Sequence, residues 1–272
     1  MKQLLIVGQT LFLSAVATLC LPHVSRAGAV YTVIVDGPDA IFLAGRTDVV
    51  IPDPSAPWNT GTFLVRHGGP TPEEAKESLP PFIPVMGGDI IRVLDPAIGG
   101  INFFNGFGPP SFGPSGNGSA GSDLTSLDGI SGYKGPQGPL AGVFLDDSIP
   151  DSGPAPATLD FTPGGIGLDF LSLSPELRQV FYIGDGQTSG GVFQQFVAPA
   201  GATRLFFAIP DGFGFGGAPG AYDDNDGSYS IRVGINTIPT ATPVPEPSTI
   251  ALLASLVPVI IFRRRLPKFF SK

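Results

Sequence analysis

The sequence has very little of the side-chain chemistry that nucleophile sites and thiolate metal sites need. It contains one cysteine, Cys20, and two histidines among its 272 residues. With a single cysteine, a disulfide framework and a thiolate zinc site are both excluded. No Gly-x-Ser-x-Gly motif is present, and Ser-His-Asp chemistry in an exported chain would depend on His67, which sits beside two glycines. We therefore expect no enzymatic activity.

Basic side chains are also few, whereas carboxylates are abundant. Residues 30–243 hold 22 Asp and Glu against 8 Lys and Arg. Such an acidic surface repels nucleic acid, which we exclude as a partner, and attracts cations. A hydrolase that uses two carboxylates stays open as an alternative. The aspartates available for it are Asp146, Asp147, Asp160, Asp169 and Asp185.

The N-terminus has the pattern of a secretory signal peptide. Lys2 precedes an apolar run from Leu4 to Leu21, and small residues follow at Ser25, Ala27 and Ala29. Cleavage after Ala27 or after Ala29 fits this pattern, since each places small residues one and three positions before the cut. A permanent membrane anchor is the alternative, but polar residues interrupt the run. Residues 1–29 are therefore predicted to be a signal peptide that exports the chain.

The C-terminus combines a short apolar segment with a basic cluster. Thr249–Phe262 gives fourteen residues without a charge, about 21 Å long as a helix, against a hydrocarbon core of roughly 30 Å. Arg263, Arg264 and Arg265 follow, and the positive-inside rule keeps them cytoplasmic. We expect a transmembrane helix with a basic tail over residues 248–272, preceded by a Pro/Thr linker over residues 237–247.

This tail resembles the PEP-CTERM protein-sorting signal. The resemblance rests on Pro245, Glu246 and Pro247, then the apolar helix, then the terminal arginines, in that order. It implies that exosortase, a membrane-embedded peptidase or transpeptidase, recognises the tail, and that the inner membrane holds the chain only transiently. The departures are Pro258 within the apolar segment and the seven residues that follow the arginines.

Between these ends, short apolar runs alternate with Gly and Pro punctuation, which predicts an all-β sandwich. The predicted strands are 30–35, 40–44, 48–51, 62–66, 90–94, 141–145, 179–183, 193–197, 203–209 and 228–234. One helix is expected over Thr71–Ser78, with Pro72 at its first position. Residues 30–84 form either a separate subdomain or further strands of the same sandwich.

Two loops, residues 101–123 and 210–230, are rich in Phe, Gly and Pro. In the second, Asp223, Asp224, Asn225 and Asp226 stand together, and such a run of oxygen-bearing side chains fits a hard cation such as Ca²⁺. An EF-hand is excluded, because placing Gly227 at the invariant glycine puts Val233 where the bidentate glutamate belongs. An acidic β-turn without a metal is the alternative.

The run Tyr222-Asp-Asp-Asn-Asp-Gly-Ser-Tyr229 resembles the calcium loop of the galactophilic bacterial lectins, a galactose-binding-like β-sandwich family. The resemblance covers about residues 85–236, and it implies that Asp224 and Asn225 are calcium ligands, with Asp211 as a further carboxylate and Ala221 as a carbonyl donor. It also implies that a galactose-like glycan binds through Ca²⁺, with Asp211 and Asp224 accepting hydrogen bonds from its hydroxyl groups. Phe213, Phe215 and Tyr222 are candidates to cover the sugar ring, with core packing as the alternative for these aromatic rings. The loop after Asp211 is about six residues longer than in the lectins.

We therefore expect an exported protein that leaves the inner membrane for the cell surface or the extracellular space. Calcium-dependent binding of extracellular polysaccharide is the first hypothesis for the folded part. A structural matrix protein without a specific ligand is the second, and a secreted hydrolase is the third. The first hypothesis differs from the second because it requires Ca²⁺, and from the third because it predicts no turnover of a glycan.

The targeting prediction can be checked by cell fractionation and N-terminal sequencing in a bacterium that carries an exosortase. We expect the chain to lie outside the cytosol with its N-terminus at or near Gly28 or Val30. Recovery of the intact, full-length chain as a soluble cytosolic protein would contradict both the signal peptide and the sorting signal.

Overall fold

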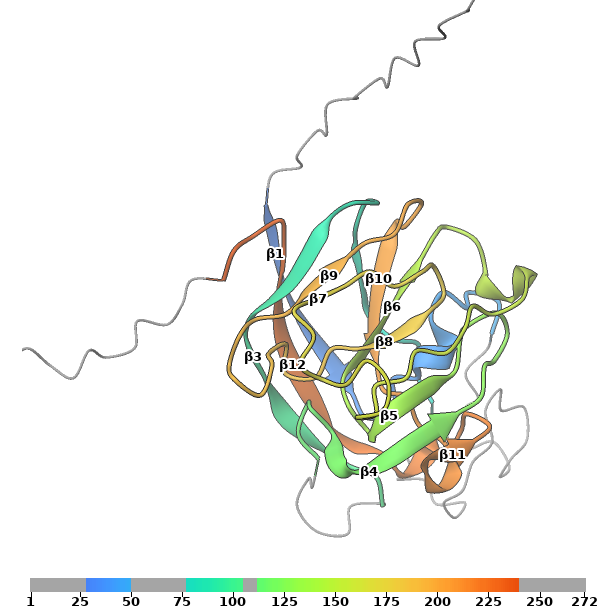
Figure 1. Ribbon diagram of the computed structural model, residues 1–272. Helices are drawn as coiled ribbons and strands as arrows, with labels where there is room; N and C mark the ends of the chain where they lie inside the picture. Colours follow the sequence, from blue (N-terminus) through green and yellow to red (C-terminus); the bar gives the residue numbers. More distant parts are fainter. Residues whose placement is uncertain (1–27, 50–76, 105–111, 240–272) are drawn as a thin grey trace, which may run out of the picture.

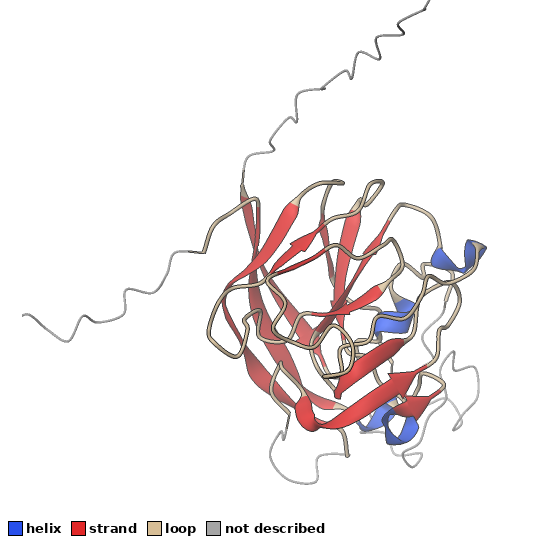
Figure 2. Cartoon of the chain, viewed as in Figure 1, coloured by secondary structure: helices blue, strands red, loops and turns tan. Residues whose placement is uncertain are grey.

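The structure, a computed structural model, describes residues 28–49, 77–104 and 112–239. In these ranges the chain forms β-strands and four short 3₁₀-helices, and no α-helix (Figures 1 and 2). The strands are β1 (Ala29–Asp36), β2 (Phe82–Pro84), β3 (Ile90–Asn102), β4 (Asn117–Leu124), β5 (Tyr133–Gln137), β6 (Ala141–Leu145), β7 (Ser172–Leu173), β8 (Val180–Tyr182), β9 (Gln195–Val197), β10 (Arg204–Ala208), β11 (Gly216–Gly217) and β12 (Asp226–Ile235). The 3₁₀-helices are η1 (Ile41–Leu43), η2 (Pro150–Ser152), η3 (Phe213–Phe215) and η4 (Tyr222–Asp224).

The strands form three sheets, so the expectation of a mostly β protein is confirmed. One sheet has the order β1-β12-β3-β9-β7, the second β2-β10-β6-β8, and the third β11-β4-β5. The first two sheets contribute to one hydrophobic core. Phe181 of β8 and Phe196 of β9 connect them, with ring centroids 5.1 Å apart. The strands at 29–36 and 82–84 belong to these same two sheets, through pairing with β12 and β10.

The burial pattern along a strand shows whether one or both of its faces are covered. In β1, Val33 and Val35 are buried while Ile34 between them is exposed, as expected for a strand with one face on the core. In contrast, every residue of β6 is buried, because this strand lies inside the second sheet between β10 and β8. Its continuous apolar run therefore reflects burial on both faces.

The predicted strand over residues 40–44 is wrong. The chain turns there into η1, where Leu43 and Ala44 donate backbone hydrogen bonds to the carbonyls three residues earlier, at Ala40 and Ile41. Ile41, Phe42 and Leu43 are fully buried. A short, wholly apolar run has no periodicity that separates a buried strand from a buried turn of helix.

Strands poor in apolar residues were not predicted. β4 and β5 carry several Gly and Pro residues, and β3 continues past residue 94 through Gly99 and Gly100 to Asn102. Gly99 has a φ of +115°, and a Cβ atom there would lie 2.2 Å from the carbonyl oxygen of Ser228 on β12. Glycine thus lets β3 stay paired with β12 where any side chain would collide.

Several predictions fall outside the described residues. These are residues 50–51 of the strand at 48–51, the strand at 62–66, residues 71–76 of the helix at 71–78, residues 1–27 of the signal peptide, and the C-terminal tail. The described residues 48–49 form no strand, so that part of the prediction is wrong. Ser78, at the end of the predicted helix, forms a parallel bridge with Asp39. Within the described ranges, no helix is long and apolar enough to cross a membrane.

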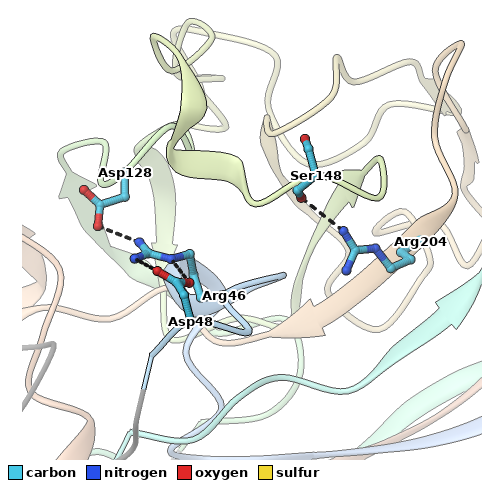
Figure 3. Close-up of polar contacts among 5 residues, drawn as sticks. All are labelled: Arg46, Asp48, Asp128, Ser148 and Arg204. Atoms are coloured by element: carbon cyan, nitrogen blue, oxygen red, sulfur yellow. Dashed lines mark hydrogen bonds and ion pairs between the residues drawn. The ribbon is translucent and has the colours of Figure 1, made fainter.

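A buried arginine fixes the loop after η1 to a distant turn. Arg46 is 6% exposed and donates to both carboxylate oxygens of Asp48, each at 2.8 Å, and to Asp128 at 2.7 Å (Figure 3). Asp128 lies in the turn that joins Leu127 to Ile130. A second arginine in the same view, Arg204 of β10, donates to the backbone carbonyl of Ser148 at 3.3 Å. These fork-shaped groups satisfy several acceptors at once.

We expect Arg46→Met to lower the free energy of unfolding by about 1–3 kcal/mol, because it removes a nearly buried cation that holds two separate segments. Arg232→Met is the matched control. Its ion pair with Asp95 joins side chains that are 54% and 59% exposed, so the loss should stay below about 1 kcal/mol. Urea unfolding of both variants measures the difference, and equal losses would show that Arg46 contributes no more than a surface ion pair.

Candidate functional site

Three chain segments that are far apart in the sequence meet at the candidate site. Gly37, directly after β1, donates from its backbone N–H to the carbonyl of Gly227 at 2.9 Å. Asn225 donates from its side-chain amide to the carbonyl of Gly37 at 3.1 Å and to the Asp211 carboxylate at 2.9 Å. The structure therefore brings two of the predicted calcium ligands, Asp211 and Asn225, into direct contact.

Asp211 is a buried carboxylate, 2% exposed, that follows β10. One of its oxygens accepts a hydrogen bond from the backbone N–H of Gly212 at 2.7 Å, and the other accepts the bond from Asn225. Burial raises the pKa of Asp211 well above its ordinary value, and the neighbouring charges of Asp224 and Asp223 raise it further, against the opposing effect of the two hydrogen bonds. A cation at this place would relieve the accumulated negative charge.

Asn225 has an oxygen that the described residues leave unused. Its Nδ2 makes the two bonds given above, whereas its Oδ1 is buried and has no hydrogen-bond partner among them. A buried polar atom without a partner costs about 1–3 kcal/mol, so such atoms usually mark a missing ligand, ion or water. An amide oxygen beside a carboxylate is a donor set that suits Ca²⁺.

The remaining predicted metal ligands, Ala221 and Asp224, lie between Asp211 and Asn225 in the sequence. Asp224 is half-buried in η4, and its charge acts on Asp211. Ala221, immediately before η4, adopts the left-handed conformation with φ 64° and ψ 23°, which is strained for a residue with a side chain. In the described ranges no group of three or more His, Cys, Asp or Glu side chains is arranged to hold a metal. A cation here would therefore need the Asn225 amide and backbone carbonyls as well as carboxylates.

Tyr222 does not present its ring to a ligand, which corrects the prediction that it covers a sugar. It is 1% exposed, and its hydroxyl donates to the carbonyl of Ile209 at 2.7 Å. The same hydroxyl accepts the backbone N–H of Asp211 at 3.1 Å. Its aromatic body belongs to the core, so its role is to hold the backbone at Asp211 in place.

Phe213 is exposed at 66%, so this predicted ligand-binding ring is accessible from solvent. Its neighbour Phe215 instead packs against the other Phe-rich loop, with ring centroids 5.6 Å from Phe103 and 6.0 Å from Phe112. The two loops singled out by composition thus lie against each other. Sequence composition identified both loops but not their contact.

Asp39, which lies two residues after Gly37, is a further buried carboxylate whose burial was not predicted. It is 6% exposed and accepts hydrogen bonds from the Ser78 hydroxyl at 2.7 Å and the Asp36 backbone at 2.9 Å. Its own backbone carbonyl accepts the N–H of Ile209. Burial raises the pKa of Asp39 to about 6. Nothing in the surrounding Gly-Pro-Asp sequence distinguishes it from an ordinary turn aspartate.

The predicted sorting residues, Pro245, Glu246, Pro247, Arg263, Arg264 and Arg265, lie outside the described residues, as does His67. Comparisons with known proteins add no assignment: no family model, no curated protein and no solved structure matches this chain.

The raised pKa of Asp39 predicts a pH dependence of stability. Since the folded state holds this proton more tightly than the unfolded state, the contribution of Asp39 to stability should fall as pH rises from about 4 to about 6 and then level off. Two pKa units correspond to at most about 3 kcal/mol. Asp39→Asn should flatten this part of the profile, whereas Asp151→Asn, at an exposed position, should leave it unchanged. A profile unaffected by Asp39→Asn in urea unfolding between pH 4 and 7 would contradict the assignment.

Proposed function

We propose that this chain is an exported protein, delivered through a PEP-CTERM-like sorting signal, whose β-rich region binds extracellular glycans through Ca²⁺. In this proposal the region is a galactose-binding-like sandwich, and Asp211, Asp224, Asn225 and the Ala221 carbonyl hold the ion. Exosortase and the inner membrane are its transient partners, and a surface or extracellular polysaccharide is its lasting one. Glycan binding itself makes and breaks no covalent bond.

The observation that carries the calcium proposal is the buried, unpartnered Oδ1 of Asn225 next to buried Asp211. Both groups are costly in their present surroundings: Oδ1 lacks a donor, and burial, together with the nearby charges of Asp224 and Asp223, raises the pKa of Asp211. A divalent cation would compensate both costs. Ca²⁺ suits this place because it accepts carboxylate, amide and carbonyl oxygens in flexible geometry.

Glycan binding follows from the same donor set. Ca²⁺ takes six to eight oxygen ligands, and neighbouring sugar hydroxyls can complete a shell that protein oxygens leave open. The exposed ring of Phe213, two residues after Asp211, is placed in sequence to cover an apolar sugar face. The 3₁₀-helix η3, which begins at Phe213, therefore belongs to the proposed binding surface.

The sheet register supports presentation of this site away from the chain ends. Ala29 pairs with Ile235 at one end of the β1–β12 pair, and Asp36 pairs with Ser228 at the other. The segments that lead to the predicted signal peptide and sorting tail therefore leave from the same end (Figure 1). The candidate site lies beyond the opposite end, next to Gly37 and Asn225. The site and the described chain ends therefore lie at opposite ends of the β1–β12 pair.

Calcium titration of the purified full-length chain in detergent tests the site directly. We expect calorimetry to show binding of one Ca²⁺ and thermal scans to show a Ca²⁺-dependent rise in Tm. Asp224→Asn should weaken the affinity about tenfold or more, because it removes a charged ligand from a site with few carboxylates. Asp226→Asn, an exposed neighbour two positions along, is the matched control and should bind Ca²⁺ normally.

The glycan part is tested by retention on galactose-bearing and exopolysaccharide resins with Ca²⁺ or with a chelator. Retention that needs Ca²⁺ and is lost in Asp224→Asn supports the proposal. Absence of Ca²⁺ binding, or equal losses for Asp224→Asn and Asp226→Asn, would reject the site. Equal matrix association with and without Ca²⁺ would instead favour a structural matrix protein.

A further inference from the structure

A cavity of about 780 Å³ lies apart from the candidate calcium site and has no residue in common with it. One side is formed by the glycines Gly118, Gly121 and Gly135 of β4 and β5, and the other by the segment from Phe161 to Phe170. Its volume is in the range of small-molecule binding sites. The absence of side chains on the glycine side lets an occupant approach the backbone closely.

The opposite side of the cavity is apolar, and a buried side chain holds it in place. Phe161 and Phe170 have ring centroids 6.0 Å apart, and Ile166 lies between them in sequence, 40% exposed. Gln194, which is fully buried, donates from its side-chain amide to the carbonyls of Leu168 and Phe170, each at 2.8 Å. These two bonds fix the course of the lining segment, so the cavity is preformed.

One lining residue, Asp169, supplies a fixed negative charge. Its two oxygens accept hydrogen bonds from the backbone N–H and the hydroxyl of Ser189, at 2.6 and 2.9 Å. These bonds lower its pKa, so the carboxylate is ionised at neutral pH. None of the described lining residues is basic. The carboxylate oxygens keep further lone pairs that can accept hydroxyl donors.

Two buried hydroxyl groups lie behind the glycine side without a partner among the described residues. Tyr133 Oη lies 2.7 Å from the position that a Cβ atom on Gly135 would occupy. Ser122 is paired with Gly135 across the β4–β5 ladder, and its Oγ is also buried and unpartnered. Unpaired buried hydroxyls reduce stability, although neither Tyr133 nor Ser122 lines the cavity itself.

We propose that this cavity is a second carbohydrate site, which takes a pyranose ring and does not need Ca²⁺. The aromatic and aliphatic lining suits the apolar face of the ring, whereas Asp169 accepts hydrogen bonds from its hydroxyl groups. Asp169 is exposed and ionised, so it can accept hydrogen bonds from the hydroxyl groups of an occupant, donors that a purely apolar chain lacks. The inference goes beyond the calcium proposal and does not depend on it.

The experiment is saturation-transfer NMR with the methyl β-D-glycosides of glucose, galactose and mannose, in excess chelator. The protein is the full-length chain in a detergent without a sugar headgroup. We expect at least one glycoside to receive saturation. Asp169→Asn, which keeps an acceptor for Ser189, and Ile166→Trp, which fills the cavity, should each weaken that binding about tenfold. The matched controls are Asp151→Asn and Ile98→Trp, at exposed positions away from the lining.

Transfer that survives the chelator, is reduced by both cavity variants and is unchanged in both controls supports the second site. No transfer to any of the three glycosides, or transfer unaffected by both cavity variants, overturns it. Thermal scans of each variant show whether the fold is intact. Because all measurements are made without free Ca²⁺, their outcome is separate from that of the calcium titration.

Discussion

The pairing of β12 with both β1 and β3 is the constraint on which the remaining structure depends. β12 is the last described strand, yet it lies between the first strand and the longest one. Its inward-facing residues Tyr229, Ile231 and Val233 are buried in the core. Because Asn225 directly precedes β12 and Gly37 directly follows β1, the same register that closes the sheet also places these two residues in contact. The register of the β1–β12 pair therefore also determines which loop residues of the candidate site meet.

Sequence patterns predicted the buried strands that are rich in β-branched and aromatic residues. β1, β6, β8, β10 and β12 all coincide closely with predicted segments. The patterns failed where glycine replaces such residues, as in β4, and where an apolar run turns instead of extending, as in η1. Glycine strands carry no alternation to detect, and their pairing depends on partners that are distant in sequence.

At the candidate site, the local motif predicted which residue types would be present better than it predicted how they are arranged and buried. The resemblance around Tyr222–Tyr229 pointed to Asp211 and Asn225, which do lie in contact. It gave no indication that Tyr222 would be buried in the core, or that Asp39 would be buried beside Ser78. These features arise from long-range packing, since Tyr222 and Asp39 both contact the backbone around Ile209. A motif specifies chemistry, whereas burial is decided by the whole fold.

The placement of the candidate site and the chain ends at opposite ends of β12 has a mechanical consequence. If a ligand holds the loop before Asp226 while a tether pulls beyond Ile235, the load runs lengthwise through β12. Because both points of load lie on the same strand, its covalent backbone carries the force, and the hydrogen bonds to β1 and β3 lie roughly perpendicular to that direction. Tension between these two points would therefore be carried along β12 without peeling the strand from its neighbours.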